Sequence, residues 1–528
     1  MTNYQFTGGT ICAPATIPGT GAISIIRVSG KESLAIADKV IDTKGVPIAE
    51  TEGYRLRYGT VFEADGSVLD NVIVSVFRAP HSYTGENSVE ISCHASRFIV
   101  NKILELLVNA GARIAAPGEF TRRAFVNGKM DLAQAEAVAD VIASQSAASH
   151  RVAMNQLKGG FSSELKVLRE KLLTMTSLLE LELDFSEEDV EFASRKELGQ
   201  LVDDSLTHIG RLTASFSRGN AIKNGVPVAI VGATNTGKST LLNALLGEER
   251  AIVSDIAGTT RDTIEETLNI DGILFRFIDT AGIRETDETI EKIGIDRTFK
   301  KLGEAAVVLG MTDLSRGEAA VLEDADFILS KVNEMGGVKN VAAENDGSET
   351  GGASQHGHGD GQERKVVILV NKCDVAGSFY KDDNGTGYGS GNDLGENMAE
   401  IGSNKNVNHN NNIVSLIENK YDNCKVIPIS AKTGKGLSTL TKTLGEIGSK
   451  ITGSTDETLV TNVRHYEALV RAASALERVR AGLHIATLPP DLIAQDLREA
   501  LYHLGEIVGE ISTDETLGNI FRNFCIGK

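Results

Sequence analysis

The stretch Gly232-Ala233-Thr234-Asn235-Thr236-Gly237-Lys238-Ser239 decides the fold of the middle of this chain. It fits the pattern G-x-x-x-x-G-K-[ST] of a phosphate-binding loop. The apolar run 226–231 before it predicts a strand, and the leucines within 240–246 predict a helix after it. In such a loop backbone N–H groups surround the phosphates, Lys238 adds a positive charge, and the Ser239 hydroxyl can bind Mg²⁺. The order strand, loop, helix therefore predicts a nucleotide-binding α/β domain.

Two further segments indicate that the nucleotide's outer phosphate is sensed. Gly258-Thr259-Thr260-Arg261-Asp262 is typical of a switch segment in which Thr260 joins Ser239 on Mg²⁺. A predicted hairpin then leads to Asp279-Thr280-Ala281-Gly282, where the aspartate reaches the metal shell and the last N–H can bond the γ-phosphate.

The choice of base is indicated by Asn371-Lys372-Cys373-Asp374, which follows a buried strand predicted over 366–370. The Asp374 carboxylate only accepts hydrogen bonds, and guanine offers two donors on one edge where adenine cannot. Ser430-Ala431-Lys432 follows a strand predicted over 426–429 and would close over the base. An ATPase is the structural alternative, and Asp374 argues against it.

The group that promotes hydrolysis is less obvious from the residues. Ras-like enzymes place a glutamine just after D-x-x-G to orient water, and here that position is Ile283. The side-chain oxygen of Asn235 could instead hold a monovalent cation beside the phosphates, in the part of an arginine finger. One of the acidic residues among Glu285, Asp287, Glu288 and Glu291 could orient water, although a solvated helix face explains most of them.

The predicted GTP-binding residues come from all of these segments. They are Asn235, Thr236, Gly237, Lys238, Ser239, Thr240, Ser254, Thr259, Thr260, Asp279, Thr280, Ala281, Gly282, Asn371, Lys372, Asp374, Ser430, Ala431 and Lys432.

The chain around this domain predicts several domains of different class. Residues 1–127 mix strands, at 23–28 and 72–76, with a helix at 97–108. Long helices are expected over 132–157 and 165–183, and the tail returns to helix with Leu497, Leu501, Leu504 and Val508 on one face. We expect domains at 1–127, 128–221, 222–454 and 455–528, with the nucleotide domain inserted into one helical domain. The fold class is thus multi-domain: an N-terminal α+β domain, an all-α domain, and an inserted Ras-like α/β domain with a doubly wound, mostly parallel sheet.

Composition limits the remaining possibilities. Segments 344–363 and 376–412 are rich in Gly, Asn, Ser and Asp, and they are expected to be disordered loops of the nucleotide domain. The five cysteines are scattered without a C-x-x-C pair, which argues against disulfides and zinc. The net charge of −19 is unfavourable for holding nucleic acid unaided. No run of about 20 apolar residues and no signal-like start is present, so we expect a cytoplasmic protein without membrane contact.

Four stretches also match a known family. They are Asn235-Thr236-Gly237-Lys238, residues 254–262, residues 279–285 and the terminal Phe524-Cys525-Ile526-Gly527-Lys528. Together they resemble the MnmE (TrmE) family of tRNA uridine-modifying GTPases, over nearly the whole chain outside the two low-complexity segments. The terminal Cys-Ile-Gly-Lys is the most specific part of the match.

The resemblance implies a potassium-dependent GTPase that forms a homodimer through an N-terminal folate-binding domain. It implies an FAD-containing partner, MnmG (GidA), in a heterotetramer or larger complex. The family installs an aminomethyl or carboxymethylaminomethyl group at the 5 position of the wobble uridine of certain tRNAs. The one-carbon unit comes from a tetrahydrofolate, such as 5-formyltetrahydrofolate or 5,10-methylenetetrahydrofolate.

The resemblance also implies roles for particular residues. Those that match the potassium site are Asn235, Ser254, Ile256 and Thr259, and those that match the Mg²⁺ ligands are Ser239 and Thr260. Glu291 matches the catalytic glutamate. Residues that match the folate pocket are Arg27, Glu90, Lys129 and Lys528. This mix suits a folate, because its carboxylates need Arg or Lys and its pterin edge needs a carboxylate acceptor; without the family, Arg27 and Glu90 would be ordinary strand-edge charges.

Cys525 allows two interpretations. Lys528 is a poor last residue for a prenylation box, and no polybasic stretch precedes it. The resemblance places this thiol near the folate pocket as a participant in the modification chemistry, since a thiol is the only strong nucleophile of the tail. A flexible, non-essential terminus is the other interpretation.

Two rival functions remain at this stage. One is a GTPase switch in ribosome assembly, for which Arg464, Arg471 and Arg478, spaced by seven, could form an RNA-binding stripe, although a solvated helix face is the favoured interpretation. The folate-type N-terminus and the terminal cysteine argue against that switch. The other is a stand-alone folate enzyme, which would leave the GTPase segments unused.

Overall fold

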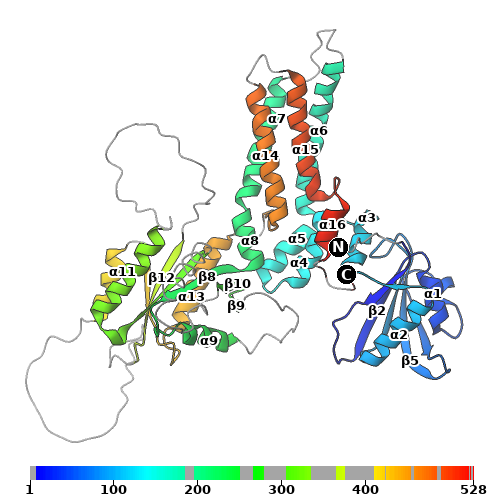
Figure 1. Cartoon of the computed structure of the whole chain (residues 1–528), viewed down its shortest axis with the longest axis horizontal. Coiled ribbons are helices and arrows are strands. Elements are labelled where there is room, and N and C mark those ends of the chain that lie inside the picture. The colour runs from blue at the N-terminus through cyan, green and yellow to red at the C-terminus, as the bar shows by residue number, and fades with distance from the viewer. Residues whose placement is uncertain are drawn as a thin grey trace, which may run out of the picture. The chain divides into compact units, whose positions relative to one another are not determined.

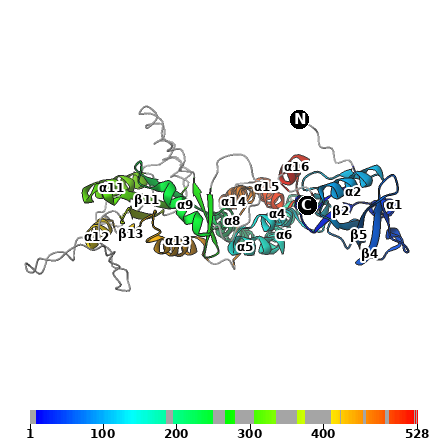
Figure 2. The ribbon, with the colours of Figure 1, turned by 90° about the horizontal axis from the view of Figure 1, so that it is seen from below.

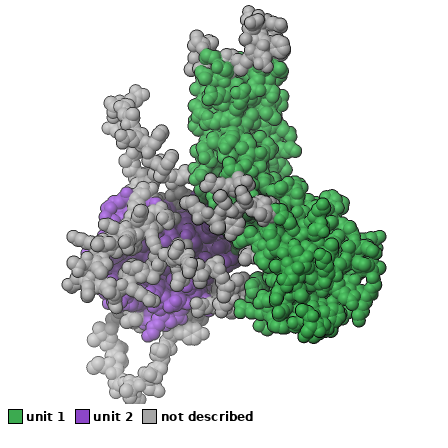
Figure 3. Space-filling view, turned by 45° about the vertical axis from the view of Figure 1, so that its right-hand side comes forward, with its two compact units in different colours: residues 1–144, 150–216, 458–528 green, residues 145–149, 217–457 purple. Residues whose placement is uncertain are grey.

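A computed structural model describes residues 8–184, 195–249, 266–278, 305–334, 364–374, 410–421, 424–453, 457–483, 489–522, 524 and 527. Contacts divide the chain into two compact units, shown in green and purple in Figure 3. Unit 1 is Met1–Ser144, His150–Phe216 and Thr458–Lys528, and unit 2 is Gln145–Ser149 and Ser217–Glu457. The second unit is thus inserted into the first.

The N-terminal part of unit 1 is a sheet of seven strands covered on one face by two helices. The strands run in the order β3-β4-β5-β6-β2-β1-β7, antiparallel except for the pair β1 and β7. Val28, Val74 and Ile91 point from the sheet to Ile103 and Leu107 of the second helix, which gives this part its core. The elements are β1 (Ile11–Pro14), β2 (Ile23–Ser29), α1 (Ser33–Val40), β3 (Ile41–Asp42), η1 (Ile48–Glu50), β4 (Arg55–Phe62), β5 (Val68–Phe77), β6 (Ser88–His94), α2 (Arg97–Asn109), β7 (Arg113–Ile114) and α3 (Glu119–Val126).

The helical part of unit 1 is a bundle formed from both sides of the insertion. Helices α6, α7, α14 and α15 run side by side in Figure 1 and share one apolar core that includes Leu172, Val202, Leu476 and Leu497. The predicted apolar face of the tail is confirmed, because Leu497, Leu501, Leu504 and Val508 are all buried there. The helices are α4 (Leu132–Ala143), α5 (Ala147–Leu157), α6 (Gly160–Asp184), α7 (Arg195–Ala214), α14 (Val463–Leu483), α15 (Pro490–Val508) and α16 (Asp514–Arg522).

The prediction of a single helix over 132–157 is wrong, because the chain forms two helices there, α4 and α5, with a break at 144–146. Ser146 and Ser149 exchange hydrogen bonds, each accepting from the other's backbone N–H at 3.2 and 3.1 Å. Such reciprocal bonds begin a new helix without needing Gly or Pro. The short segment 145–149 belongs to unit 2, where Asn269 donates to the Gln145 carbonyl at 3.0 Å.

Unit 2 is a doubly wound α/β domain with a six-stranded sheet in the order β13-β12-β11-β8-β10-β9, parallel except for β9. Leu241, Leu440 and Leu444 of α9 and α13 cover one face, and Ala325 and Ile328 of α11 cover the other. Figure 2 shows α11 and α13 on opposite sides of these strands. The elements are α8 (Phe216–Asn224), β8 (Val226–Gly232), α9 (Lys238–Glu249), β9 (Glu266–Ile270), β10 (Ile273–Ile278), β11 (Val307–Asp313), η4 (Leu314–Arg316), α11 (Glu318–Glu334), β12 (Lys365–Asn371), α12 (Asn410–Lys420), β13 (Cys424–Pro428) and α13 (Leu437–Thr452).

The chain leaves and returns to unit 1 at one place. The Val460 N–H donates to Ser215 Oγ at 3.0 Å, and the Phe216 and Tyr466 rings stack with centroids 4.5 Å apart. Close ends are the condition under which an inserted domain is tolerated. The domain boundaries given above stay predictions.

Two expectations about irregular segments meet the structure only in part. Residues 344–363 and most of 376–412 lie outside the described residues. The expectation of disorder up to residue 412 is wrong at its end, because helix α12 begins at Asn410. Ile417 of this helix is buried, and Lys420 and Tyr421 both bond Asp326, which explains why the helix forms there. Within the described residues, no helix is both long enough and apolar enough to cross a membrane.

Candidate functional site

The phosphate-binding loop joins β8 to α9 as predicted, and its second glycine cannot be replaced without a clash. Gly237 has φ +99°, and a Cβ there would stand 2.5 Å from Asn371 Nδ2. The Lys238 ammonium lies inside the loop and donates to the Gly232 and Ala233 carbonyls at 2.8 and 2.7 Å. Burial lowers the pKa of Lys238. Among the described residues, only backbone carbonyls hold this buried cation, at a position where phosphate oxygens would be better partners.

Asn235 stands at the outer side of this loop in a left-handed conformation, with φ +60°. Asparagine tolerates this conformation better than most residues. The side chain is exposed, and it makes no hydrogen bond to any residue that the structure describes. No described residue therefore occupies its side-chain oxygen, which suits the binding of a ligand.

Asn371 links three of the predicted segments. Its Nδ2 donates to the Thr236 carbonyl of the phosphate-binding loop at 2.7 Å. Its Oδ1 accepts from the Ala431 N–H at 3.0 Å. The side chain is buried, so these bonds have no competition from water. Sequence reasoning listed Asn371 among the GTP-binding residues, and the structure shows that its side chain organises the loops around the nucleotide site.

The residues expected at the base lie at the ends of β12 and β13. Asp374 and Lys432 are exposed, whereas Ser430 is fully buried and accepts from the Thr433 N–H at 3.3 Å. Lys372 forms an ion pair with Asp313 at 2.6 Å. The structure therefore brings together the loops of 232–240, 371–374 and 430–432, with Asp374 available to a ligand.

Several predicted residues cannot be placed. They are Ser254, Ile256, Thr259, Thr260, Asp279, Thr280, Ala281, Gly282, Glu291, Cys525 and Lys528, which all lie outside the described residues.

A second cluster of predicted residues forms in the N-terminal sheet of unit 1. Arg27 of β2 lies opposite Glu90 of β6 and pairs with it at 2.8 Å. The Arg27 guanidinium also faces the rings of Tyr83 and Phe120, 5.1 and 5.7 Å from their centroids. Sequence reasoning missed these two aromatic residues, because nothing local marks a ring that meets an arginine on another strand.

The C-terminal tail contacts this cluster through Gly527. Arg27 donates to the Gly527 carbonyl at 3.4 Å. Gly527 has φ +98°, and a Cβ there would lie 2.1 Å from the Pro14 carbonyl oxygen. Phe524 is buried against Phe521 and Leu517, so a hydrophobic anchor precedes this contact. Lys129 is exposed and donates to the Pro80 carbonyl at 3.1 Å.

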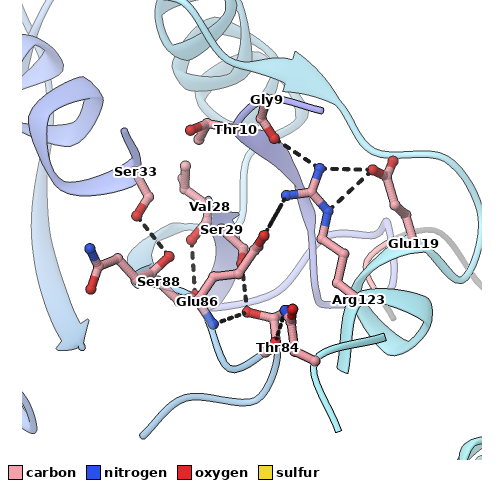
Figure 4. A network of polar contacts seen from close by, with 12 residues as sticks. Gly9, Thr10, Val28, Ser29, Ser33, Thr84, Glu86, Ser88, Glu119 and Arg123 are labelled. Carbon is pink, nitrogen blue, oxygen red and sulfur yellow. Dashed lines mark hydrogen bonds and ion pairs between the residues drawn. The ribbon is translucent and has the colours of Figure 1, made fainter. Parts of the chain in front are cut away.

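A buried ionic network supports the strands beneath this cluster, and Figure 4 shows it from close by. Arg123 pairs with Glu86 and Glu119, both at 3.0 Å, and donates to the Gly9 carbonyl at 2.8 Å. Ser29 donates to Glu86 at 2.8 Å. Burial alone would raise the pKa of Glu119, and the bonds from Arg113, the Ala116 N–H and Arg123 lower it overall. Glu119 thus stays ionised, and the network fixes α3 to the sheet.

Of the three arginines considered for an RNA-binding stripe, Arg471 and Arg478 are exposed, as expected of a solvated helix face, whereas Arg464 is only partly exposed. Arg464 bonds both oxygens of Glu136 at 3.0 and 2.8 Å, and Arg478 pairs with Asp496 and Glu499. Interpreting Arg464 as part of a solvated face was therefore wrong, since its side chain lies between α4, α14 and α15. The apolar spacing of α14 could not show that a carboxylate on α4 faces this position.

The fold and the first cluster define a class. Unit 2 is a P-loop domain of the guanine-nucleotide type. Its doubly wound sheet carries the phosphate-binding loop after β8 and the exposed Asp374 after β12, and the buried Asn371 side chain joins the loops.

Comparisons with known proteins give the family. The family model described as "GTP-binding protein TrmE N-terminus" matches residues 10–129, and that of the "MnmE helical domain" matches residues 132–525. A relative named tRNA modification GTPase MnmE, from Parabacteroides distasonis, is 46% identical over 526 residues, which cover 98% of this chain and 100% of the relative. One of the same name from Flavobacterium johnsoniae is 46% identical over 520 residues, covering 98% and 99%. The chain belongs to the MnmE family of tRNA modification GTPases.

Similarity to solved structures is much weaker. A structure of Era from Aquifex aeolicus bound to GDP.AlF4⁻ is 24% identical, covers 47% of this chain and 66% of its own, and has a TM-score of 0.26. Such a score supports no argument, and the family assignment depends on the family models and the sequence relatives.

Proposed function

We propose that this chain hydrolyses GTP to drive or time a folate-dependent modification of the wobble uridine of certain tRNAs at the 5 position. The product is a carboxymethylaminomethyl or aminomethyl group, made with the FAD-containing MnmG (GidA) in a heterotetramer or larger complex. The observation that favours this function is the presence of two separate sites in one chain of this family. One is the guanine-type loop set held by Asn371, and the other is the Arg27–Glu90 cluster that the C-terminal tail reaches.

Hydrolysis is proposed to depend on K⁺ and Mg²⁺. Asn235 would hold K⁺ together with Ser254, Ile256 and Thr259, and the left-handed, exposed position of Asn235 suits this role. Ser239 and Thr260 would hold Mg²⁺; Ser239 is exposed in the first turn of α9, as a ligand to a bound metal must be. Glu291 is the proposed catalytic glutamate, and a bound K⁺ would offset the charge that develops on the phosphates.

A tetrahydrofolate is proposed to bind near Arg27, Glu90, Lys129 and Lys528. The donor set fits the ligand, because Arg27 and the lysines can pair with folate carboxylates while Glu90 can accept from the N–H groups of a pterin. The nearby rings of Tyr83 and Phe120 provide flat apolar surface beside these charges. A one-carbon unit such as that of 5-formyltetrahydrofolate or 5,10-methylenetetrahydrofolate would then lie near the tail, in which Cys525 is the proposed nucleophile.

A homodimer is proposed to form through the N-terminal sheet. Leu56 and Tyr58 of β4 and Ile73 of β5 lie on the face opposite α1 and α2, with exposures of 66%, 65% and 48%. Three neighbouring large apolar side chains exposed on one sheet face are typical of an interaction surface. The proposed location is the cytoplasm, where the tRNA substrate is found.

The experiment that tests the function is mass spectrometry of tRNA nucleosides from a strain that lacks the gene. We expect the modified wobble uridine to disappear and to return with the wild-type gene. An unchanged nucleoside profile would instead favour a GTPase switch in ribosome assembly, the alternative function. The purified protein should also hydrolyse GTP much faster in K⁺ than in Na⁺, and equal rates would remove the cation role of Asn235.

A further inference from the structure

Asp313 occupies a position that the nucleotide-binding motifs do not include. It ends β11, the strand between β8, which leads into the phosphate-binding loop, and β12, which leads to Asp374. In the parallel register Asp313 lies beside Asn371. Only 7% of its side chain is exposed. A carboxylate this buried at the ligand end of the sheet needs a partner for its charge.

The partners of Asp313 divide between its two oxygens. Oδ1 accepts from the Ser315 N–H at 2.9 Å and from Ser315 Oγ at 2.6 Å. Oδ2 accepts from the Lys372 ammonium at 2.6 Å. Burial alone would raise the pKa of Asp313, and the bonds from Lys372 and Ser315 lower it below the ordinary value. The carboxylate is therefore ionised at neutral pH and binds Lys372 as a charged group.

Lys372 is held in an unusual backbone conformation. Its φ is +63°, a left-handed conformation that is uncommon for lysine and persists only where the surroundings impose it. The next N–H, of Cys373, donates to the Ile429 carbonyl at 3.2 Å, which fixes the turn from the other side. Within the described part of the chain, Asp313 is the only ion-pair partner of Lys372.

The competing partner for this lysine is close in the sequence. Asp374 follows two residues later, is exposed, and is the group whose free carboxylate is needed for the guanine edge. A released lysine ammonium would be the opposite charge nearest in sequence to that carboxylate, and an exposed pair of this kind changes an equilibrium by about fivefold at most. Such a pair would compete with the two donors of the base.

We propose that Asp313 is a positioning residue for guanine recognition, which holds the Lys372 ammonium at the end of β11 and so leaves the Asp374 carboxylate free for the base. The inference depends on the nucleotide-binding function proposed above. It assigns a role in base selection to a residue 59 positions away from Lys372 in the chain.

The test is a double-mutant cycle on the full-length protein, with the dissociation constants of GDP and of inosine diphosphate as readouts. Inosine diphosphate lacks the 2-amino donor, so its ratio to GDP reports on Asp374. We expect Asp313→Asn to weaken GDP binding about fivefold, the upper limit for one exposed ion pair between the released Lys372 and Asp374, and to reduce the preference for GDP. In a Lys372→Met background, Asp313→Asn should change both readouts less than about twofold, because no ammonium remains to compete.

Other outcomes separate the possible errors. If Asp313 only stabilises the strand end, Asp313→Asn will lower the melting temperature and weaken GDP equally in both backgrounds, and the inference is overturned. If wild-type protein does not bind GDP, the proposed function fails before the inference is reached. Asp313→Glu keeps a negative charge within reach of Lys372, so we expect this variant to retain the preference for GDP. It serves as the test if Asp313→Asn does not fold. Loss of the preference for GDP in Asp313→Glu would also contradict the inference.

Discussion

Replacing Asn371 by alanine is the sharpest test of how the nucleotide site is organised. The substitution removes the donor to the Thr236 carbonyl and the acceptor from the Ala431 N–H, at 2.7 and 3.0 Å. Both bonds are fully buried. An unsatisfied buried polar group costs about 1–3 kcal/mol, so two of them cost about 2–6 kcal/mol. Partial rearrangement of the loops reduces this, and we take about 3 kcal/mol.

The effect on nucleotide affinity follows from the fraction of molecules that keep the loops in place. If GDP binds only to molecules with the loops in place, a fall in the fraction of such molecules weakens the apparent affinity for GDP by the same factor. At about 1.4 kcal/mol per tenfold change, 3 kcal/mol predicts GDP binding weaker by roughly 100-fold. The assay is titration of the purified protein with a fluorescent GDP analogue.

Two further variants make the result interpretable. Asn371→Asp keeps an acceptor for the Ala431 N–H but turns a charged oxygen toward the Thr236 carbonyl, so it should weaken binding at least as much as Asn371→Ala. Asn224→Ala is the matched control, because Asn224 is exposed and bonds only Asn220 among the described residues. GDP affinity within about twofold of wild type for Asn371→Ala would show that the two bonds do not hold the loops together.

Three other predictions concern the rest of the molecule. Glu136→Gln should destabilise the helices around Arg464 and His465 by about 3 kcal/mol, since one partner of a buried ion pair is lost; hydrogen exchange of α4 and α14 peptides measures this. Burial alone would raise the pKa of Glu136, but His465 and Arg464 lower it below its ordinary value of 4.5. The ionised Glu136 therefore stabilises the folded protein fully above pH 4.5, and this stabilisation is lost as the pH falls below that value. The difference between wild type and variant should accordingly shrink in acid, and a difference independent of pH would contradict the ion-pair explanation. Gly527→Ala should displace the tail from the Pro14 carbonyl and weaken tetrahydrofolate binding in calorimetry, whereas unchanged binding would separate the tail from the folate site. Tyr58→Asp should shift the protein from dimer to monomer in light scattering, and a dimer that persists would move the interface elsewhere.

Much of the fold was predictable because it depends on local pattern. The strands predicted over 226–231, 366–370 and 426–429 lie close to their observed bounds, since buried parallel strands are continuous apolar runs. The hairpin predicted before Asp279, without bounds, is also present as β9 and β10. The break at 144–146 was missed because two serines begin the second helix, and serine is also tolerated inside helices.

The chemistry of individual side chains was less predictable, because it depends on which residues meet across the fold. Arg464 and Glu136 are 328 positions apart, and no local signal connects them. Asn371 was recognised from its motif, but the direction of its side chain, toward Thr236 and Ala431, depends on how three loops pack. Arg27 and Glu90 were identified through the family resemblance, and the antiparallel register that makes them partners became visible only in the sheet.

The guanine site suggests a general reason why its important residues are scattered. Asp313 and Asn371 stand beside each other at the ends of two parallel strands, and each fixes a residue that belongs to another loop. Parallel strands bring their carboxyl ends to one edge, where loops of distant sequence meet. Sensitivity to mutation at this site should therefore follow the strand register and not the distance along the chain from Asp374. On this argument Asp313, which no nucleotide motif includes, should affect base selection more than the exposed Lys432, although Lys432 lies within the segment predicted to close over the base.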